Sequence, residues 1–229
     1  MDWVIVLVLL ALIVIVVMYI TLTRESEPES YFGFADEKER WIPPEIVNDI
    51  LTQEDCKYLI EKATPLFHPS QVVGSSATDK ASRTSETAWI DKDDPVARKV
   101  LEKAMQLTGK PMENCEKLQV VRYKPGTFYR NHHDACCDDD PGCGEFVKNG
   151  GQRVGTLLVY LNNEFTDGET HFPSFNDLKL KAPTGSAIFF RPLSDECGKC
   201  HPNALHAGLP ISSGTKYVCN AWVRQGRFM

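Results

Sequence analysis

Four residues of this chain have the types and spacing of a metal centre with a cationic partner: His132, Asp134, His206 and Lys216. A strand points residues i and i+2 to the same face, so His132 and Asp134 can bind one ion while His133 faces away. With His206 they make two imidazoles and one carboxylate, which leave one face of an octahedral ion open, as in non-haem Fe(II) oxygenases. Lys216, ten residues after His206, supplies the cation that a dicarboxylate co-substrate needs.

The second histidine ligand has two candidates. His201 directly follows Cys200 in a Gly- and Cys-rich stretch, whereas His206 lies in the strand-like segment 205–208 and is the better candidate. A single histidine, or a lone His-X-Asp pair, is more often an ordinary hydrogen-bonded or surface group. The pair combined with a distant histidine and a lysine is the stronger signal.

Lys216 begins a predicted strand on which Val218, Asn220 and Trp222 share its face. A solvated surface strand is the common alternative. Trp222 instead indicates an interior face, where a lysine is costly unless it meets an anion. Tyr123, nine residues before His132, adds a hydroxyl to the same predicted anion site.

The elements that must position these residues change character along the chain. Thr52 and Asp55 resemble a capping box at the start of one amphipathic helix. A second helix has Asp94 as its N-cap, Pro95 in its first turn and Gly109 at its end. An edge strand is predicted over 42–47, and period-two strands over 117–123, 128–134, 153–161, 169–172, 186–190, 204–207 and 216–223. This order predicts an α+β fold with a double-stranded β-helix (jelly-roll) core and the N-terminal helices on one side.

The first part of the chain has the pattern of a membrane anchor. Residues 3–23 carry no charge and are long enough to cross the hydrocarbon core. A cleaved secretory signal is the alternative, but a positive leader and a small-X-small cleavage site are missing. The sequence therefore predicts a transmembrane signal-anchor over 1–23, a linker rich in Glu, Ser and Pro over 24–40, and one catalytic domain over 41–229.

Charge and cysteine content bear on location and partners. The flanking charges do not fix the membrane orientation, but eight cysteines favour an oxidising lumen, and so a single-pass type II protein of the endoplasmic reticulum. The net charge is −6 and no basic run follows the membrane segment, so nothing in the composition asks for a nucleic-acid partner.

Five cysteines flank the predicted ligands, namely Cys136, Cys137, Cys143, Cys197 and Cys200. If the two ligand strands are antiparallel neighbours, the two Cys-bearing loops lie close together. Disulfides at the rim of the site are favoured, and a Cys₄ or Cys₃His zinc site or free thiols are the alternatives. The sequence does not show which cysteines pair. Cys56, from its helical phase, is expected to be a buried apolar residue.

Several motifs, in this order, resemble the 2-oxoglutarate- and Fe(II)-dependent prolyl 4-hydroxylases, in particular the single-domain plant, algal and viral members. The resemblance covers 43–223. The matching motifs are Arg83-Thr-Ser85, Tyr123-X-X-Gly126-X-X-Tyr129-X-X-His132-X-Asp134, Gly150-Gly-Gln-Arg153, Tyr160-Leu-Asn, Gly168-Glu-Thr170-X-Phe-Pro173, and Leu205-His206-Ala-Gly with Lys216 and Trp222.

The resemblance implies a role for each matched position. His132, Asp134 and His206 would be the iron ligands, and Lys216, Tyr123, Thr170 and Trp222 would bind 2-oxoglutarate. The peptide would be bound by Arg83, Ser85, Trp89, Glu116 and Arg153, with Trp89 stacking on a proline ring of an extended, polyproline II substrate that is proline-rich or collagen-like. The implied reaction uses Fe(II), O₂ and 2-oxoglutarate, releases succinate and CO₂, and draws on L-ascorbate to rescue oxidised iron.

Two other functions are compatible with the same residues. One is a related dioxygenase, such as a lysyl hydroxylase or a nucleic-acid demethylase. In these relatives the distal carboxylate usually meets arginine, so Lys216 and the Arg83-Thr-Ser85 stretch favour proline. The other is a non-catalytic metal-binding jelly-roll module, which would have no need for open iron positions.

Overall fold

The computed structural model describes residue 3 and residues 33–71, 82–137 and 141–229. The chain divides into two units, 1–31 and 32–229. The predicted membrane segment, apart from Trp3, lies outside the described residues. Across the described ranges, no helix is both long enough and apolar enough to span a membrane.

Residues 33–41, called the N-terminal strap below, are bonded to the rest of the domain. Gly33 donates its backbone N–H to the Cys137 carbonyl at 2.7 Å, and Ala35 donates to the Cys200 carbonyl at 2.9 Å. The indole Nε1 of Trp41 donates to the Arg191 carbonyl at 2.8 Å. Residues 33–40 of the predicted linker therefore pack on the domain.

Two helices precede most of the sheet, with the ends that the sequence predicted. Helix α2 (Gln53–Ala63) starts with a complete capping box between Thr52 and Asp55. Helix α3 (Pro95–Thr108) starts at Asp94, whose side chain accepts from the backbone N–H groups of the first turn, and ends at Gly109 in the left-handed conformation with φ 68°. Buried residues at helical spacing, including Cys56, face the sheet as expected.

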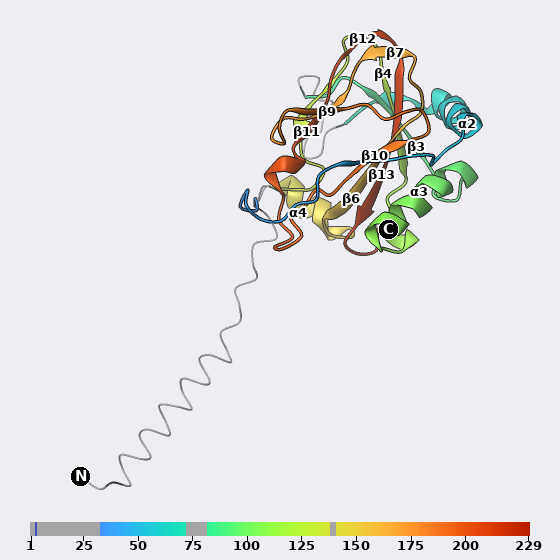
Figure 1. The fold of residues 1–229 in the computed structure, drawn as a ribbon. Helices are drawn as coiled ribbons and strands as arrows, with labels where there is room; N and C mark the ends of the chain where they lie inside the picture. Colours follow the sequence, from blue (N-terminus) through green and yellow to red (C-terminus); the bar gives the residue numbers. More distant parts are fainter. Residues whose placement is uncertain (1–2, 4–32, 72–81, 138–140) are drawn as a thin grey trace. The chain divides into compact units, whose positions relative to one another are not determined.

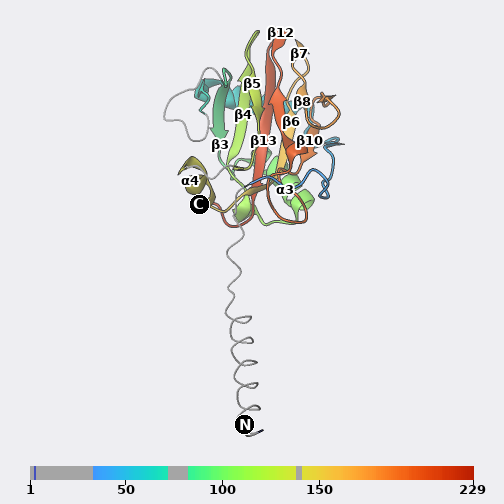
Figure 2. The ribbon, with the colours of Figure 1, turned by 90° about the vertical axis from the view of Figure 1, so that its left-hand side faces the viewer.

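The main sheet has seven antiparallel strands in the order β1-β10-β6-β13-β4-β3-β2. Its strands β10, β6, β13, β4 and β3 can be followed in Figures 1 and 2. Its strands are β1 (Glu45–Val47), β2 (His68–Pro69), β3 (Glu86–Ile90), β4 (Leu118–Tyr123), β6 (Arg153–Tyr160), β10 (Ala187–Phe190) and β13 (Lys216–Arg224). The long strand β13 lies between β4 and β6, with Lys216 opposite Tyr123 and Trp222 opposite Thr156. The predicted edge strand is present as β1.

Two smaller sheets complete the β structure. One has the order β5-β11-β8-β9, and the other pairs β12 with β7. Their strands are β5 (Tyr129–His132), β7 (Phe165–Asp167), β8 (Thr170–Phe172), β9 (Leu178–Leu180), β11 (His206–Gly208) and β12 (Ile211–Gly214). A short helix, α4 (Pro141–Lys148), lies between β5 and β6 in the chain. The core is thus sheet-rich α+β, as predicted, in an arrangement consistent with a jelly roll.

The seven-stranded sheet separates two hydrophobic layers. Side chains from α2 and α3 pack on one face together with alternate strand residues such as Val120, Cys219 and Ala221. On the other face the sheet packs against the smaller sheets, through residues that include Tyr160 and Phe172. The period-two alternation of the strands creates this separation, and the candidate site lies on the second face.

Several short elements were not predicted. Strands β2, β3, β7, β9 and β12 and helix α4 were not predicted, because a strand of two to five residues shows too few alternations to be recognised. The strand predicted over 204–207 is present as β11, but it starts two residues later because Pro202–Ala204 form a single-turn 3₁₀ helix. The predicted strand over 128–134 was too long, since β5 ends at His132.

Candidate active site

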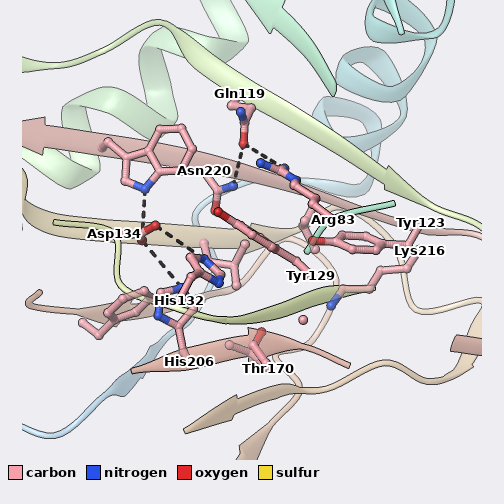
Figure 3. A pocket seen from close by; sticks show the side chains of 16 residues that line it. Arg83, Gln119, Tyr123, Tyr129, His132, Asp134, Thr170, His206, Lys216 and Asn220 are labelled. Carbon is pink, nitrogen blue, oxygen red and sulfur yellow. Dashed lines mark hydrogen bonds and ion pairs between the residues drawn. The ribbon is translucent and has the colours of Figure 1, made fainter. Parts of the chain in front are cut away.

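A pocket on the second face of the main sheet contains most of the predicted site residues (Figure 3). Its lining residues are Arg83, Gln119, Tyr123, Tyr129, His132, Asp134, Leu158, Thr170, Phe190, His206, Ala207, Gly208, Lys216, Val218, Asn220 and Trp222. This space is called the inner pocket below. Three side chains that can ligate a metal lie at one end, and Lys216 lies at the other (Figure 3).

The three ligand side chains come from two adjacent segments. His206 on β11 is directly opposite His132 on β5, so the antiparallel register brings the two imidazoles together with their ring centroids 4.2 Å apart. The Nε2 atom of His132 is 3.8 Å from Oδ1 of Asp134, and that of His206 is 3.8 Å from Oδ2. One nitrogen from each histidine and a carboxylate oxygen thus converge, as binding of one octahedral Fe(II) through a single face requires.

Asp134 reaches this point by a different route from the one predicted. Because β5 ends at His132, Asp134 lies in a bend beyond the strand, and the i, i+2 rule of a strand does not place it. His133 stays outside the ligand set and packs edge-on against Phe34 at 5.2 Å. The predicted ligands do meet, but the carboxylate is positioned by contacts other than the sheet.

Both histidines are oriented through their second nitrogen. The Nδ1 atom of His132 lies 2.8 Å from the Arg130 carbonyl, and that of His206 lies 3.0 Å from the Ala204 carbonyl. A carbonyl accepts only from a protonated Nδ1, so each Nε2 keeps its lone pair for a metal. Burial, and then the neighbouring His206, lower the pKa of His132 well below 6.5, which favours the neutral ligand.

The carboxylate of Asp134 is held mainly through one oxygen. Thr156 donates its hydroxyl to Oδ2 at 2.7 Å, and Trp222 donates its indole N–H to the same oxygen at 3.1 Å. Burial raises the pKa of Asp134, but His206, His132 and Arg153 outweigh it, and the pKa falls to about 2. The carboxylate is therefore ionised and oriented before any metal arrives.

Lys216 occupies the closed end of the inner pocket. It is 1% exposed, and its Nζ donates to the Gly168 carbonyl at 2.6 Å. Gly168 has φ 74°, a conformation that favours glycine. The rings of Tyr123 and Tyr160 lie 5.1 and 5.0 Å from Nζ. Burial lowers the pKa of Lys216 to about 7, although Glu169 opposes the shift, so this amine needs an anion to stay charged.

Two of the three other residues predicted to bind 2-oxoglutarate, Thr170 and Tyr123, line the inner pocket together with Lys216. The third, Trp222, also lines this pocket but donates its indole N–H to Asp134. The Oγ1 atom of Thr170 is 2.9 Å from the hydroxyl oxygen of Tyr160. Burial raises the pKa of Tyr123, so its hydroxyl stays protonated and can donate to a carboxylate. Together with the lysine they form a polar end of the pocket, opposite the end that holds the three possible metal ligands.

An outer pocket adjoins the inner one and shares six of its residues. It is lined by Gln71, Arg83, Trp89, Gln119, Tyr129, His132, His133, Asp134, Ala135, Cys136, Phe146, Arg153 and Trp222. His132 and Asp134 line both pockets, so the candidate metal site lies where the two meet. Trp89 is 40% exposed and lies 6.2 Å from Trp222, ring centroid to ring centroid, which leaves an aromatic face available to a ligand.

The predicted peptide-binding residues divide into two groups. Arg83, Trp89 and Arg153 line the outer pocket. Ser85 is buried and accepts a hydrogen bond from Nε of Arg83 at 2.8 Å. Glu116 lies outside both linings, buried between Arg153 and Arg224.

Glu116 supports the outer pocket from behind. Its carboxylate accepts from Nε of Arg153 at 2.7 Å and from a second guanidinium nitrogen at 2.9 Å. Burial raises the pKa of Glu116, but Arg153 and Arg224 outweigh it and lower the pKa. The guanidinium of Arg153 in turn stacks 3.6 Å from the Trp222 ring. Glu116 therefore acts by orienting Arg153.

Four of the five cysteines form two disulfides, the favoured prediction, and one of these bonds joins the two loops. Cys136 pairs with Cys143, and Cys137 pairs with Cys200. Cys197 is a free thiol. His201, the rejected ligand candidate, is fully buried and stacks on Trp41 with ring centroids 5.3 Å apart. It belongs to the packing of the N-terminal strap.

Several side chains of the site were not predicted from the sequence. Thr156 is the most important, because it bonds a predicted ligand directly. Gln119 accepts from Asn220 at 3.1 Å and lines both pockets, and Phe146 on α4 lines the outer one. A signal existed for Thr156 and Gln119, since each is a polar residue inside an otherwise apolar strand.

Residues 118–224 match the model of the 2OG-Fe(II) oxygenase superfamily. The two converging histidines, the carboxylate and the lysine at the far end of the pocket agree with this class. Among solved structures, a viral collagen prolyl hydroxylase of Paramecium bursaria Chlorella virus-1, solved as a 2-oxoglutarate complex, superposes with a TM-score of 0.60. It is 32% identical, over 79% of this chain and 95% of that one.

Relatives at the level of sequence are more specific. A protein named as a prolyl 4-hydroxylase from Acanthamoeba polyphaga mimivirus is 42% identical over 197 residues, which cover 86% of this chain and 80% of the relative. Prolyl 4-hydroxylase 1 of Arabidopsis thaliana is 31% identical over 81% of this chain and 70% of its own length. The chain belongs to the prolyl 4-hydroxylase family.

Proposed function

We propose that this protein hydroxylates peptidyl proline to 4-hydroxyproline, with 2-oxoglutarate as co-substrate and Fe(II) in the site. The observation that carries the proposal is that two adjoining pockets, with different side chains, meet at the three possible metal ligands. The inner pocket holds a buried amine at its closed end, and the outer pocket offers an exposed tryptophan. The ligand set lies where they meet, so a co-substrate and a peptide can approach one metal from different sides.

The residues of the inner pocket fit Fe(II) and 2-oxoglutarate. His132, Asp134 and His206 would hold the ion. When bound, Fe(II) activates O₂ together with 2-oxoglutarate, which is decarboxylated to succinate and CO₂ while proline gains a hydroxyl. Lys216 would bind the distal carboxylate, with Tyr123 and Thr170 as hydroxyl donors. The apolar lining, including Leu158 and Phe190, excludes water from the reacting centre.

The outer pocket fits an extended, proline-rich chain. Proline lacks a backbone N–H and favours the extended polyproline II conformation, which has no internal hydrogen bonds. Recognition therefore relies on stacking against the proline ring and on hydrogen-bond donors to the peptide carbonyls. Trp89 supplies the ring, and Arg83 and Arg153 supply donors. Collagen-like repeats are one such substrate. The relatives named above as prolyl hydroxylases support proline as the target, in preference to lysine or a methylated base.

We further propose that residues 3–23 anchor the protein and that the catalytic domain lies in the lumen of the endoplasmic reticulum. The two disulfides support an oxidising compartment. A requirement for L-ascorbate belongs to the same proposal, as a reductant for iron oxidised in unproductive turnovers. Protease protection of the domain in microsomes tests the location, and turnover numbers with and without ascorbate test the requirement.

The deciding experiment measures succinate release and the site of oxygen incorporation. A proline-rich peptide, a lysine-bearing peptide and a methylated oligonucleotide are each incubated with the protein, Fe(II), 2-oxoglutarate and ascorbate. We expect succinate release coupled to the proline peptide alone, with one oxygen atom found on the proline ring by mass spectrometry. Coupling to either other substrate would replace the proposal with that activity.

Substitution of the proposed metal ligands tests whether the protein is an enzyme or a non-catalytic binding module. His132→Ala and Asp134→Ala should each lose at least about 100-fold in turnover, more than the 10- to 100-fold typical of a group that only orients a ligand. His171→Ala is a matched control, because His171 pairs with Asp177 outside both pocket linings. Succinate release that persisted in both ligand variants would show that the site is assigned wrongly.

A further inference from the structure

We propose that the Cys137–Cys200 disulfide is a positioning element for the iron site, which makes Fe(II) affinity depend on the redox state of this one cystine. The inference rests on the proposed function, because it concerns the metal that the function requires. It starts from the two segments that carry the ligands. Each leaves the sheet next to a ligand, and the disulfide joins them just beyond that point.

The first segment loses its sheet contacts at the ligand itself. Strand β5 ends at His132, so no ladder hydrogen bond fixes Asp134. Cys137 follows Asp134 by three residues. On the other side, Cys200 precedes His206 by six residues, and a 3₁₀ turn fills part of the gap. The disulfide therefore links the segment that carries Asp134 to the segment that carries His206.

The cystine is built into a small core of its own. Ala135 and Leu193 pack against it, and Cys137 and Cys200 are only 8% and 1% exposed. The N-terminal strap covers this core through backbone bonds. Gly33 donates to the Cys137 carbonyl and accepts from the Cys200 N–H at 3.1 Å. The cystine is thus held on both sides, and a shift of either loop is transmitted to the ligand beside it.

The second disulfide offers a matched comparison within the same loop. Cys136 is adjacent to Cys137, and its bond to Cys143 ties the loop to α4. That bond does not reach the segment that carries His206. It restrains the chain near Asp134 as closely in sequence, yet it cannot fix the spacing between the two ligand segments. A variant without Cys137–Cys200 loses the link between the two ligand segments, whereas a variant without Cys136–Cys143 loses only a restraint within one loop. Comparing the two variants therefore distinguishes positioning of the ligands from general stiffening of the loop.

The experiment measures Fe(II) dissociation constants of the full chain under anaerobic conditions, by competition with a chromophoric chelator. We expect Cys137→Ser/Cys200→Ser to weaken Fe(II) binding by about 10- to 100-fold, the range typical for groups that orient metal ligands. Cys136→Ser/Cys143→Ser should bind Fe(II) like the wild type, whatever happens to peptide affinity. Equal affinities in all three proteins, or equal losses in both variants, would overturn the inference.

A second measurement uses the wild type and does not depend on the folding of a variant. In a glutathione buffer, two glutathione thiols supply two electrons and two protons to one cystine, which gives two cysteine thiols and one glutathione disulfide. Differential alkylation and mass spectrometry then report the reduced fraction of each cystine at equilibrium. Coupling between two sites is reciprocal, so saturating Fe(II) should shift the reduction equilibrium of Cys137–Cys200 by the same factor that the disulfide contributes to Fe(II) affinity.

The two measurements distinguish the inference from the function beneath it. A wild-type protein that binds no Fe(II) would refute the proposed function. A wild type that binds Fe(II), with an unshifted Cys137–Cys200 equilibrium, would refute the positioning role and leave the function intact. The Cys136–Cys143 equilibrium should not respond to Fe(II), and a shift as large as that of Cys137–Cys200 would also refute the role.

Discussion

The two faces of the seven-stranded sheet differ in the polarity of their buried side chains. On the helix-covered face the strands contribute apolar residues such as Val120 and Ala221, which pack without polar groups. On the other face the same strands bury Gln119, Thr156 and Lys216, which are 5%, 1% and 1% exposed. Buried polar groups are destabilising unless they are paired. The first face therefore stabilises the fold, and the second retains costly groups for ligands.

The largest functional effect is expected at the buried amine. Lys216→Met keeps a long side chain but removes the charge, so 2-oxoglutarate affinity should fall by about 2–5 kcal/mol, the usual loss for a truncated buried charge pair. Because the amine is already costly to bury, the melting temperature at pH 7 should not fall. Calorimetric titration with 2-oxoglutarate in the presence of Mn(II) measures the affinity, and thermal unfolding measures the melting temperature. Undiminished affinity would remove Lys216 from the co-substrate site.

A substitution on the opposite face should give the reverse pattern. Leu101 on α3 is fully buried in the helix-side core. Leu101→Ala should lower the free energy of unfolding by about 2–5 kcal/mol through the cavity it leaves. The dissociation constant of 2-oxoglutarate, measured below the unfolding transition, should stay unchanged. A large change in that constant would mean that the two faces are not independent.

A smaller effect is expected at Thr156, the residue that holds Oδ2 of Asp134. Thr156→Val keeps the shape and removes the donor, while Trp222 still bonds the same oxygen. Fe(II) affinity should fall by about 10-fold, at the low end of the range for partners of metal ligands. Thr156→Ser restores the hydroxyl and should bind Fe(II) nearly like the wild type. Equal affinities for the valine and serine variants would contradict this role.

The mildest test changes only pH. The pKa of unliganded Lys216 is about 7, and a bound carboxylate must raise it. Below this pKa the amine is already charged, so 2-oxoglutarate affinity should be flat. Above it, binding must take up a proton, so affinity should weaken by about tenfold per pH unit until the pKa of the complex is reached.

Lys216→Arg provides the control for the pH experiment. Arginine stays charged throughout the accessible range, so the slope above pH 7 should vanish in this variant even if its affinity is lower. A slope that persisted would mean that another group titrates with 2-oxoglutarate. Calorimetry in buffers of different ionisation enthalpy counts the protons directly.

Much of this architecture was predictable because it follows from local patterns. The caps at Thr52, Asp94 and Gly109 and the alternation on β13 determined the helices and the pocket face. The residue types and spacing predicted that His132, Asp134 and His206 would meet, and their side chains do converge. The bend at Asp134 was not, because it depends on contacts with Thr156 and Trp222 that come from distant strands.

The N-terminal strap shows the same limit. Its highly charged composition is typical of a linker, but it is attached to the domain by backbone bonds to Cys137 and Cys200 that no local pattern reveals. Disulfide pairing was unpredictable for a related reason, since adjacent cysteines bond to different parts of the chain. Local periodicity therefore predicts elements well, whereas attachments between loops require the three-dimensional structure.

The outermost strands of the main sheet have a consequence for self-association. Strand β1 has three residues and follows Pro44 directly, and β2 has two residues and ends in Pro69. Proline has no N–H to offer a neighbouring chain, and such short borders present few free backbone groups. At high concentration, two copies of this protein can therefore form few hydrogen bonds between the edges of their main sheets, which disfavours edge-to-edge aggregation.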